Sequence, residues 1–238
     1  MIISNVDAGS IYKVLKHKSF YFKYEPIYNV CEKKIAAYEA LLRVNINDEN
    51  LRSPDNFIAI AEVFFPDLVN DVLYTVFKKS AIYFRQKIHF NLSINNLKFL
   101  DKTDIKENIV YEITEEVLSS LENFKYIKKK ADEGFKFAID DFGRGYNSFS
   151  NILNQEVKYE YIKFDKELIM NLREKRVQKA LRSLRCIFEK DIGCTVLVEG
   201  VEKKWEYDVL RELGFCFMQG WYFRDVEDDD FADESYLL

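Results

Sequence analysis

Strand-like and helix-like segments alternate along this chain, and the alternation limits the folds open to it. Runs rich in β-branched and aromatic residues are separated by segments whose apolar residues recur every three or four positions. The predicted strands are 20–28, 35–43, 87–92, 108–113, 135–140, 159–164, 195–199 and 215–219. Two helices are expected within 54–85, starting with Ser53 before Pro54, and others around 117–127 and 177–188. Eight such strands favour a TIM-like (β/α)8 barrel, although a doubly wound open sheet has the same local pattern.

Length and composition indicate one compact domain. The 238 residues are 48% hydrophobic, and single barrels of this size are common. Only three prolines and eight glycines occur, and no stretch resembles a flexible linker.

The chain is expected to be cytoplasmic and not bound to a membrane. Its uncharged stretches are far shorter than a membrane span, and its first residues lack the pattern of a signal peptide. Cys31, Cys186, Cys194 and Cys216 show no paired spacing, so reduced core thiols are predicted.

Charge and histidine content narrow the possible chemistry. A net charge of −5 does not favour a polymeric nucleic-acid partner, which requires a basic patch. His17 and His89 are the only histidines, and neither lies in a motif typical of a zinc site or a catalytic triad. Oxygen ligands, lysine or carboxylates are therefore expected to carry any catalysis.

Polar residues interrupt the apolar strands near their C-terminal ends. They are Glu39, Asn91, Glu112, Asp140, Asp141, Lys163, Glu199 and Gln219, and they come from seven of the eight predicted strands. A barrel gathers these strand ends around one mouth, where barrel enzymes keep their active sites. These side chains are therefore expected to converge.

Several carboxylates in one small cavity repel one another unless a cation neutralises them or some become protonated. Carboxylate and amide oxygens select hard ions such as Mg²⁺ or Mn²⁺, and the adjacent Asp140 and Asp141 could address two ions. Each residue taken alone has an ordinary structural explanation. A strand-end carboxylate is usually a helix cap, and Lys163 could be a buried salt-bridge partner. Asn91 and Gln219 could simply satisfy turns or interior hydrogen bonds.

Residues in this pattern resemble the EAL family of cyclic di-GMP phosphodiesterases. Seven segments occur in the family's order, namely YEALLR, FNLS, YEITEE, IDDFGRGYNS, YIKFD, VEGVE and MQGWYF. The resemblance runs from about Phe20 to about Phe223 and implies a barrel whose first strand is antiparallel to the others. Residues 1–19 are then expected to form an N-terminal extension packing on the barrel, and 20–238 the barrel domain with a short acidic tail.

The resemblance also implies roles for individual residues. Metal ligands are Glu39, Asn91, Glu112, Asp140 and Asp141, the last two addressing a second ion. Lys163 orients the attacking water, Glu199 holds a water at the metal and assists proton transfer, and Gln219 belongs to the catalytic set. Substrate-side residues are Glu25, Leu42, Arg43 and Glu202, and Glu115 anchors the loop after strand five. Arg43 suits a phosphate because its planar guanidinium can form two parallel hydrogen bonds.

The implied activity is hydrolysis of cyclic di-GMP to linear 5′-pGpG by Mg²⁺ or Mn²⁺, with two ions bound, Ca²⁺ inhibitory and a homodimer expected. Glu25 departs from the glutamine usual in the family and places a carboxylate near the nucleotide. One alternative is a non-catalytic member that binds cyclic di-GMP or a protein. Another is a barrel enzyme acting on a different phosphate ester, because the residues alone predict only metal-assisted hydrolysis.

Overall fold

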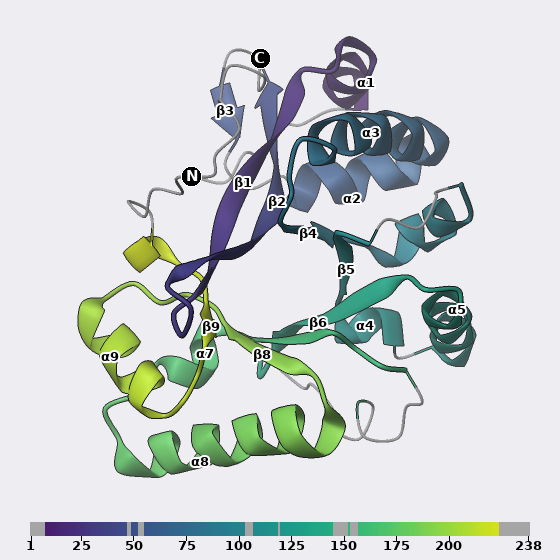
Figure 1. Ribbon diagram of the computed structural model, residues 1–238. Coiled ribbons are helices and arrows are strands. Elements are labelled where there is room, and N and C mark those ends of the chain that lie inside the picture. Colours follow the sequence, from purple (N-terminus) through teal and green to yellow (C-terminus); the bar gives the residue numbers. More distant parts are fainter. Residues whose placement is uncertain are drawn as a thin grey trace.

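The protein forms a cylinder of strands surrounded by helices (Figure 1). The computed structural model describes residues 8–46, 49–51, 55–102, 107–118, 120–144, 152 and 157–223. Its first elements are α1 (Ala8–His17), β1 (Phe20–Asn29), β2 (Lys34–Ile46), β3 (Glu49–Leu51), α2 (Asp55–Phe64), α3 (Pro66–Ala81), β4 (Lys87–Asn91) and the 3-10 helix η1 (Ile94–Lys102). Then come β5 (Ile109–Ile113), α4 (Glu115–Leu118), α5 (Leu121–Asp132), β6 (Lys136–Phe142), β7 (Tyr161–Phe164) and α7 (Lys166–Ile169). The last are α8 (Lys175–Cys186), the π-helical η2 (Ile187–Ile192), β8 (Thr195–Val198), α9 (Lys204–Glu212), β9 (Phe217–Met218) and η3 (Trp221–Phe223).

Strand pairing closes the sheet into a barrel. From β2 the parallel order runs through β4, β5, β6, β7 and β8 to β9. β1 pairs antiparallel with both β2 and β9 and so joins the two ends of this row. Within the described residues the cylinder therefore has eight strands, and β3 pairs only with the end of β2. The barrel and its antiparallel first strand are confirmed, and the open-sheet alternative is excluded.

The helical layer covers apolar strand faces. All five residues of β5 are buried, as expected for a strand covered on both sides. The two helices expected within 54–85 are α2 and α3, whereas Ser53 lies outside the described residues. The helical pattern around 117–127 is split into α4 and α5, because Ser120 caps α5 by accepting a hydrogen bond from the Asn123 backbone.

Some elements were not predicted from the pattern. α1 packs against α2, α3 and β2 through Ile11, Val14 and Leu15, which are spaced for one helical face. The short elements β3, α7 and α9 were also missed. β3 and α7 have only three and four residues, so local periodicity gives little sign of them. The nine residues of α9 do have one apolar face, with Leu210 buried, so the sequence carried a signal for this helix.

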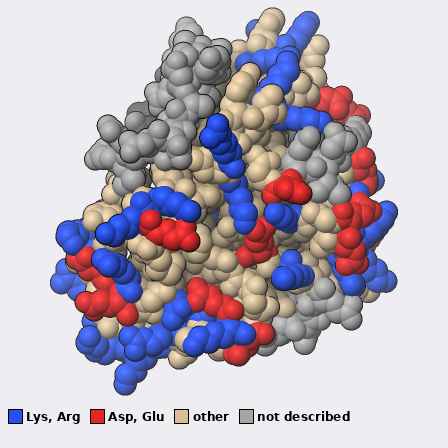
Figure 2. Space-filling model, viewed as in Figure 1, with Lys and Arg blue, Asp and Glu red and all other residues tan. Residues whose placement is uncertain are grey.

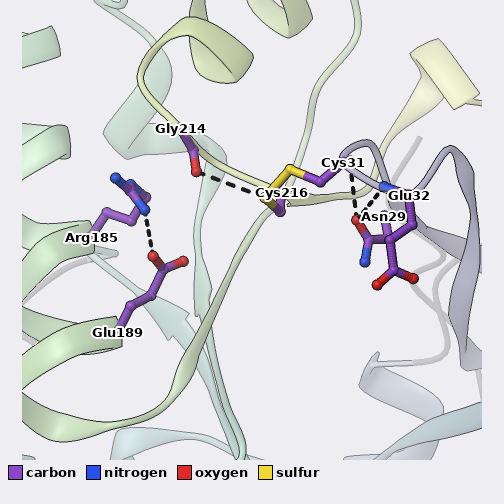
Figure 3. The surroundings of a disulfide bond; sticks show 7 residues. All are labelled: Asn29, Cys31, Glu32, Arg185, Glu189, Gly214 and Cys216. Atoms are coloured by element: carbon purple, nitrogen blue, oxygen red, sulfur yellow. Dashed lines mark hydrogen bonds and ion pairs between the residues drawn. A yellow bond between two sulfur atoms is a disulfide. The ribbon is translucent and has the colours of Figure 1, made fainter.

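Two of the four cysteines form a disulfide, so the prediction of four reduced thiols is wrong for this pair. Cys31 and Cys216 are bonded across 185 positions of sequence, with Cα atoms 5.2 Å apart (Figure 3). Their approach follows from the pairing of β1 with β9, and the Val30 amide donates to the Cys216 carbonyl oxygen. The bond lies just after β1 and just before β9, at the end of the barrel opposite the C-terminal ends of the parallel strands. Cys186 and Cys194 are free thiols.

The described surface carries charges of both signs. On the face shown in Figure 2, Lys and Arg side chains are interspersed with those of Asp and Glu. Many of these charges pair locally, such as Lys204 with Asp208 at 2.8 Å on α9. Within the portion of the chain that the structure describes, no helix has the length and apolar character needed to cross a membrane.

Replacing Cys31 with serine is expected to lower the free energy of unfolding by about 2–5 kcal/mol, because the bond restricts a very long loop in the unfolded chain. Urea unfolding of the oxidised protein measures the change. Cys186→Ser is the matched control, since Cys186 is a free thiol, and it should unfold like the wild type. Equal stability of wild type and Cys31→Ser without reductant would contradict the prediction.

Candidate active site at the mouth of the barrel

Alternation along the strands builds a polar site above an apolar floor. The barrel interior holds two small apolar clusters, one formed by Ile27, Ala37 and Leu197 and one by Val110, Ala138 and Tyr161, with Phe217 packed against both. A polar residue lies two positions from each of these apolar residues, on the side of the C-terminal ends of the parallel strands. Because side chains alternate with a period of two, both sets face the interior. This polar set is Glu25, Glu39, Glu112, Asp140, Lys163, Glu199 and Gln219, and Asn91 joins it from β4, two residues after the buried His89.

Lys163 lies at the centre of the polar set. It is 1% exposed on β7, and its Nζ is 2.8 Å from Glu112 Oε2 and 2.8 Å from Glu199 Oε1. The same nitrogen is 2.9 Å from Asp140 Oδ1 and 3.5 Å from Glu39 Oε1. A single ammonium therefore contacts carboxylates from four other strands or strand ends.

Glu39 is held from several directions. The Gln219 amide donates to its Oε2 at 2.6 Å, and the Asn91 amide donates to its Oε1 at 3.2 Å. Glu25 is its direct cross-strand partner in the β1–β2 pair, so both side chains face the same side of the sheet. The site thus includes residues from the first and last strands as well as from the middle of the chain.

Burial and mutual charge shift the pKa values of these groups. Burial raises the pKa of Glu112 well above its ordinary value, with Lys163 opposing the shift and Glu39 adding to it. Burial likewise raises the pKa of Glu199 to about 8. For Glu39, burial acts upward, but the Lys163 charge and the hydrogen bond from Gln219 outweigh it and lower the pKa. Burial acts downward on Lys163, yet the surrounding carboxylates raise its pKa well above the ordinary value. The site therefore holds more negative charge than its lysine balances.

The donor chemistry fits a hard divalent cation. Carboxylate oxygens of Asp140, Asp141 and Glu199 lie within 4.8 Å of one another, and all three residues are partly exposed. Asp141 adopts a left-handed backbone conformation with φ of 54°, which Asp tolerates better than most residues. Gly143 follows with φ of 99°, and a Cβ there would meet the Leu168 side chain at 2.3 Å. The irregular backbone near the end of β6 thus lets the carboxylates of the adjacent Asp140 and Asp141 lie close together.

A cavity of about 540 Å³ opens beside these carboxylates. Its wall includes Asn91, Asp140 and Asp141 on one side and the guanidinium-bearing Arg43 and Arg144. The remaining wall is largely apolar and comes from β2, α2, α3 and η1. Such a pocket, with a few convergent charges in an apolar wall, is typical of a small-molecule site.

Most of the residues predicted from sequence lie together at this mouth. Leu42 and Arg43 line the cavity, with Arg43 Nη1 donating to the Leu42 carbonyl oxygen at 2.9 Å. Glu202 is exposed on the loop after β8, and its backbone amide donates to Glu206 Oε2 at 2.9 Å. Glu115 begins α4, but its side chain lies outside the described residues.

One buried carboxylate beside the cavity was missed. Glu62 on α2 is 7% exposed and accepts hydrogen bonds from Ser93 Oγ, Asn95 Nδ2 and Asn96 Nδ2 at 2.6–2.9 Å. It ties the outer helix to the start of η1 and so shapes one wall. The sequence does carry a signal for Glu62, because it is a lone acidic residue on the apolar face of the segment FIAIAEVF.

His89 was also missed, although it lies two residues before Asn91 on the same inward face of β4. It is fully buried, and its Nδ1 is 2.8 Å from Glu112 Oε1. Alternation along this strand was the available signal, because it places residue 89 beneath a predicted site residue.

Comparison with known proteins identifies the family. The family model of the EAL domain matches residues 8–225. The chain belongs to the EAL domain family. This EAL domain is 26% identical over 236 residues to the probable cyclic di-GMP phosphodiesterase PdeB of Escherichia coli (strain K12), a match covering 91% of this chain and 45% of PdeB. The chain thus spans less than half the length of that relative.

Solved structures agree with the fold. An EAL domain protein from Listeria monocytogenes EGD-e superposes with a TM-score of 0.75 at 24% identity, covering 92% of this chain and 93% of that one. BlrP1 of Klebsiella pneumoniae, solved as a manganese and cyclic di-GMP complex, superposes with a TM-score of 0.69 at 25% identity. That match covers 85% of this chain and 54% of BlrP1.

Removing the central ammonium should destabilise the EAL domain. Lys163→Met is expected to lower the free energy of unfolding by about 3–5 kcal/mol near pH 8, because buried carboxylates lose their partner. Ionisation of an acid whose folded-state pKa is raised destabilises the folded protein, so stability falls as the pH rises from the unfolded-state pKa to the folded-state pKa. The difference in stability between Lys163→Met and the wild type should therefore shrink at about pH 5.5. Urea unfolding of the metal-free protein at both pH values measures this.

The exposed Lys175 on α8 supplies the control, and Lys175→Met should behave like the wild type at both pH values. A Lys163→Met deficit that does not depend on pH would contradict the electrostatic explanation and point to lost packing alone.

Proposed function

We propose that this EAL domain hydrolyses cyclic di-GMP to linear 5′-pGpG in a reaction that requires Mg²⁺ or Mn²⁺. The observation that carries the proposal is the excess of carboxylates around Lys163, placed next to a cavity that also presents Arg43 and Arg144. The names of PdeB and of the BlrP1 complex support cyclic di-GMP as the ligand class.

The cavity suits a doubly anionic dinucleotide. The guanidinium groups of Arg43 and Arg144 offer charge and paired donors for phosphate oxygens. The apolar wall offers a surface for bases, which are planar and weakly hydrated on their faces. Arg144 is also 3.5 Å from Asp141, and its side chain is largely exposed, so its guanidinium is available to a phosphate beside that carboxylate.

Two cations are proposed for the site. Asp140, Asp141 and Glu199 would hold one of them, and Asp140 would be shared with a second set formed by Glu39, Asn91 and Glu112. When bound, such ions acidify a water molecule and stabilise negative charge on the phosphate.

The chain's own residues then divide the remaining work. Lys163 donates hydrogen bonds that orient the attacking water, and Glu199, 2.8 Å from Lys163, accepts the water proton. A new bond forms between the water oxygen and phosphorus, the bond from phosphorus to the 3′ oxygen breaks, and the proton passes to that oxygen. Gln219 keeps Glu39 in place through its 2.6 Å hydrogen bond.

The direct test is incubation of the purified protein with cyclic di-GMP and Mg²⁺ or Mn²⁺, followed by chromatography. Linear dinucleotide is expected, and Glu39→Gln should lower the rate at least roughly 100-fold, because cation binding contributes several kcal/mol to catalysis. The exposed Glu122 on α5 gives the matched control, since Glu122→Gln should retain the wild-type rate.

The other outcomes distinguish the alternatives. Tight binding of cyclic di-GMP without product under either ion would favour the non-catalytic regulator. Turnover of a different cyclic nucleotide, in a panel tested alongside, would favour another phosphate ester. A homodimer stays a prediction that sedimentation can check.

Glu25 is expected to limit affinity for the nucleotide. Its carboxylate faces the same side as Glu39, where an anionic ligand is proposed to bind. Glu25→Gln should tighten binding roughly fivefold, equal to about 1 kcal/mol for like charges in a partly solvated site. Calorimetric titration of cyclic di-GMP in Ca²⁺, expected to allow binding without turnover, measures it. Unchanged binding by the variant would contradict the predicted repulsion, and weaker binding would indicate that Glu25 instead accepts a hydrogen bond from the ligand.

A further inference from the structure

His89 departs from the apolar floor on which the polar set rests. The equivalent inward-facing residues of the neighbouring strands are alanine, valine, tyrosine, leucine, isoleucine and phenylalanine. His89 is 0% exposed, and a buried imidazole costs free energy unless it makes a hydrogen bond. An apolar residue at this position would avoid that cost, so the hydrogen bond made by His89 is expected to have a role that an apolar side chain could not fill.

That contact is a single bond to Glu112. Nδ1 of His89 is 2.8 Å from Glu112 Oε1, and both side chains are 0% exposed. Nε2 of His89 has no hydrogen-bond partner in the described part of the protein, and the ring meets the Tyr161 ring at a centroid distance of 4.8 Å. When Glu112 is ionised, the state in which a carboxylate binds a cation, a neutral imidazole satisfies this contact by carrying its proton on Nδ1.

A neutral imidazole donates a hydrogen bond through one ring N–H and carries no charge of its own. A neutral donor fixes the orientation of a carboxylate without cancelling the negative charge that binds a metal ion, whereas a cationic donor cancels that charge.

Lys163 cannot perform this task alone. It approaches the other Glu112 oxygen at 2.8 Å, but the same nitrogen also contacts Asp140 and Glu199. A cation entering the site competes with that shared ammonium for the carboxylates. The His89 bond, by contrast, comes from beneath the site and is made to Glu112 only.

We propose that His89 is a positioning residue, whose Nδ1–H holds the Glu112 carboxylate in the orientation that receives a divalent cation. The inference rests on the proposed function to the extent that Glu112 is a metal ligand. Hydrogen-bond donors of this kind to metal-binding side chains typically change metal affinity by roughly 10–100-fold when removed.

Titration of the full chain with Mn²⁺ alone, followed by electron paramagnetic resonance of the free ion, tests the affinity. His89→Leu should weaken Mn²⁺ binding by roughly 10–100-fold. His89→Asn places an amide nitrogen near the position of Nδ1 and should recover most of that loss. Both variants are first checked for cooperative unfolding.

Equal Mn²⁺ affinity of wild type and a folded His89→Leu would overturn the inference while leaving the proposed function intact. A wild type that binds no Mn²⁺ would contradict the proposed function, and the inference with it.

Imidazole ¹⁵N NMR of the wild type decides the matter even if the variants do not fold. The chain has only two histidines, and exposed His17 serves as the internal reference. Adding Mg²⁺ should shift the signals of His89 but not those of His17, and with Mg²⁺ bound His89 should carry its proton on Nδ1. A proton on Nε2 of His89 in the Mg²⁺-bound protein, or His89 signals that do not change with Mg²⁺ although the protein binds Mn²⁺, would refute the role.

Discussion

Lys163 sits fully buried among carboxylates of Glu39, Glu112, Asp140 and Glu199, and the remainder of the site is arranged around this imbalance of charge. One ammonium cannot neutralise four acids in a region with little water, so the pKa values of Glu112 and Glu199 rise. Divalent cations would relieve the same repulsion more completely than protons. The cluster of Asp140, Asp141 and Glu199 has the donor chemistry that such a cation requires.

The barrel makes this concentration of charge possible. Strands are rigid and alternate strictly, so one polar residue per strand can be presented above a packed apolar interior. The interior cluster around Val110, Ala138 and Tyr161 excludes water from below, which strengthens every electrostatic contact above it. Near the end of β6 the strand departs from regular geometry, with a register shift between Ile139 and Phe142 and a left-handed backbone at Asp141, and the second carboxylate lies there beside the first.

Local pattern was enough to predict the barrel strands and the polar residues at their ends, because each of those signals lies within a few residues of sequence. Contacts made by closure of the barrel left no such signal. Cys31 and Cys216 are 185 positions apart, and nothing in their spacing indicates that the first and last strands are neighbours. Likewise, Glu62 and His89 were visible as polar residues in apolar segments, but their partners are known only once the helices and strands are assembled.

The seam between first and last strands links stability to the geometry of the site. β9 has only two residues, and it pairs with β1 through Tyr28 opposite Met218 and Asn29 opposite Phe217. Ladder hydrogen bonds over so short a length hold a strand weakly, and the disulfide adds a covalent tie next to them. Gln219 follows β9 directly and donates to Glu39, and its backbone bonds Val198 and Val201 on the β8 side. The donor to Glu39 is therefore held by the same short strand that closes the cylinder between β8 and β1.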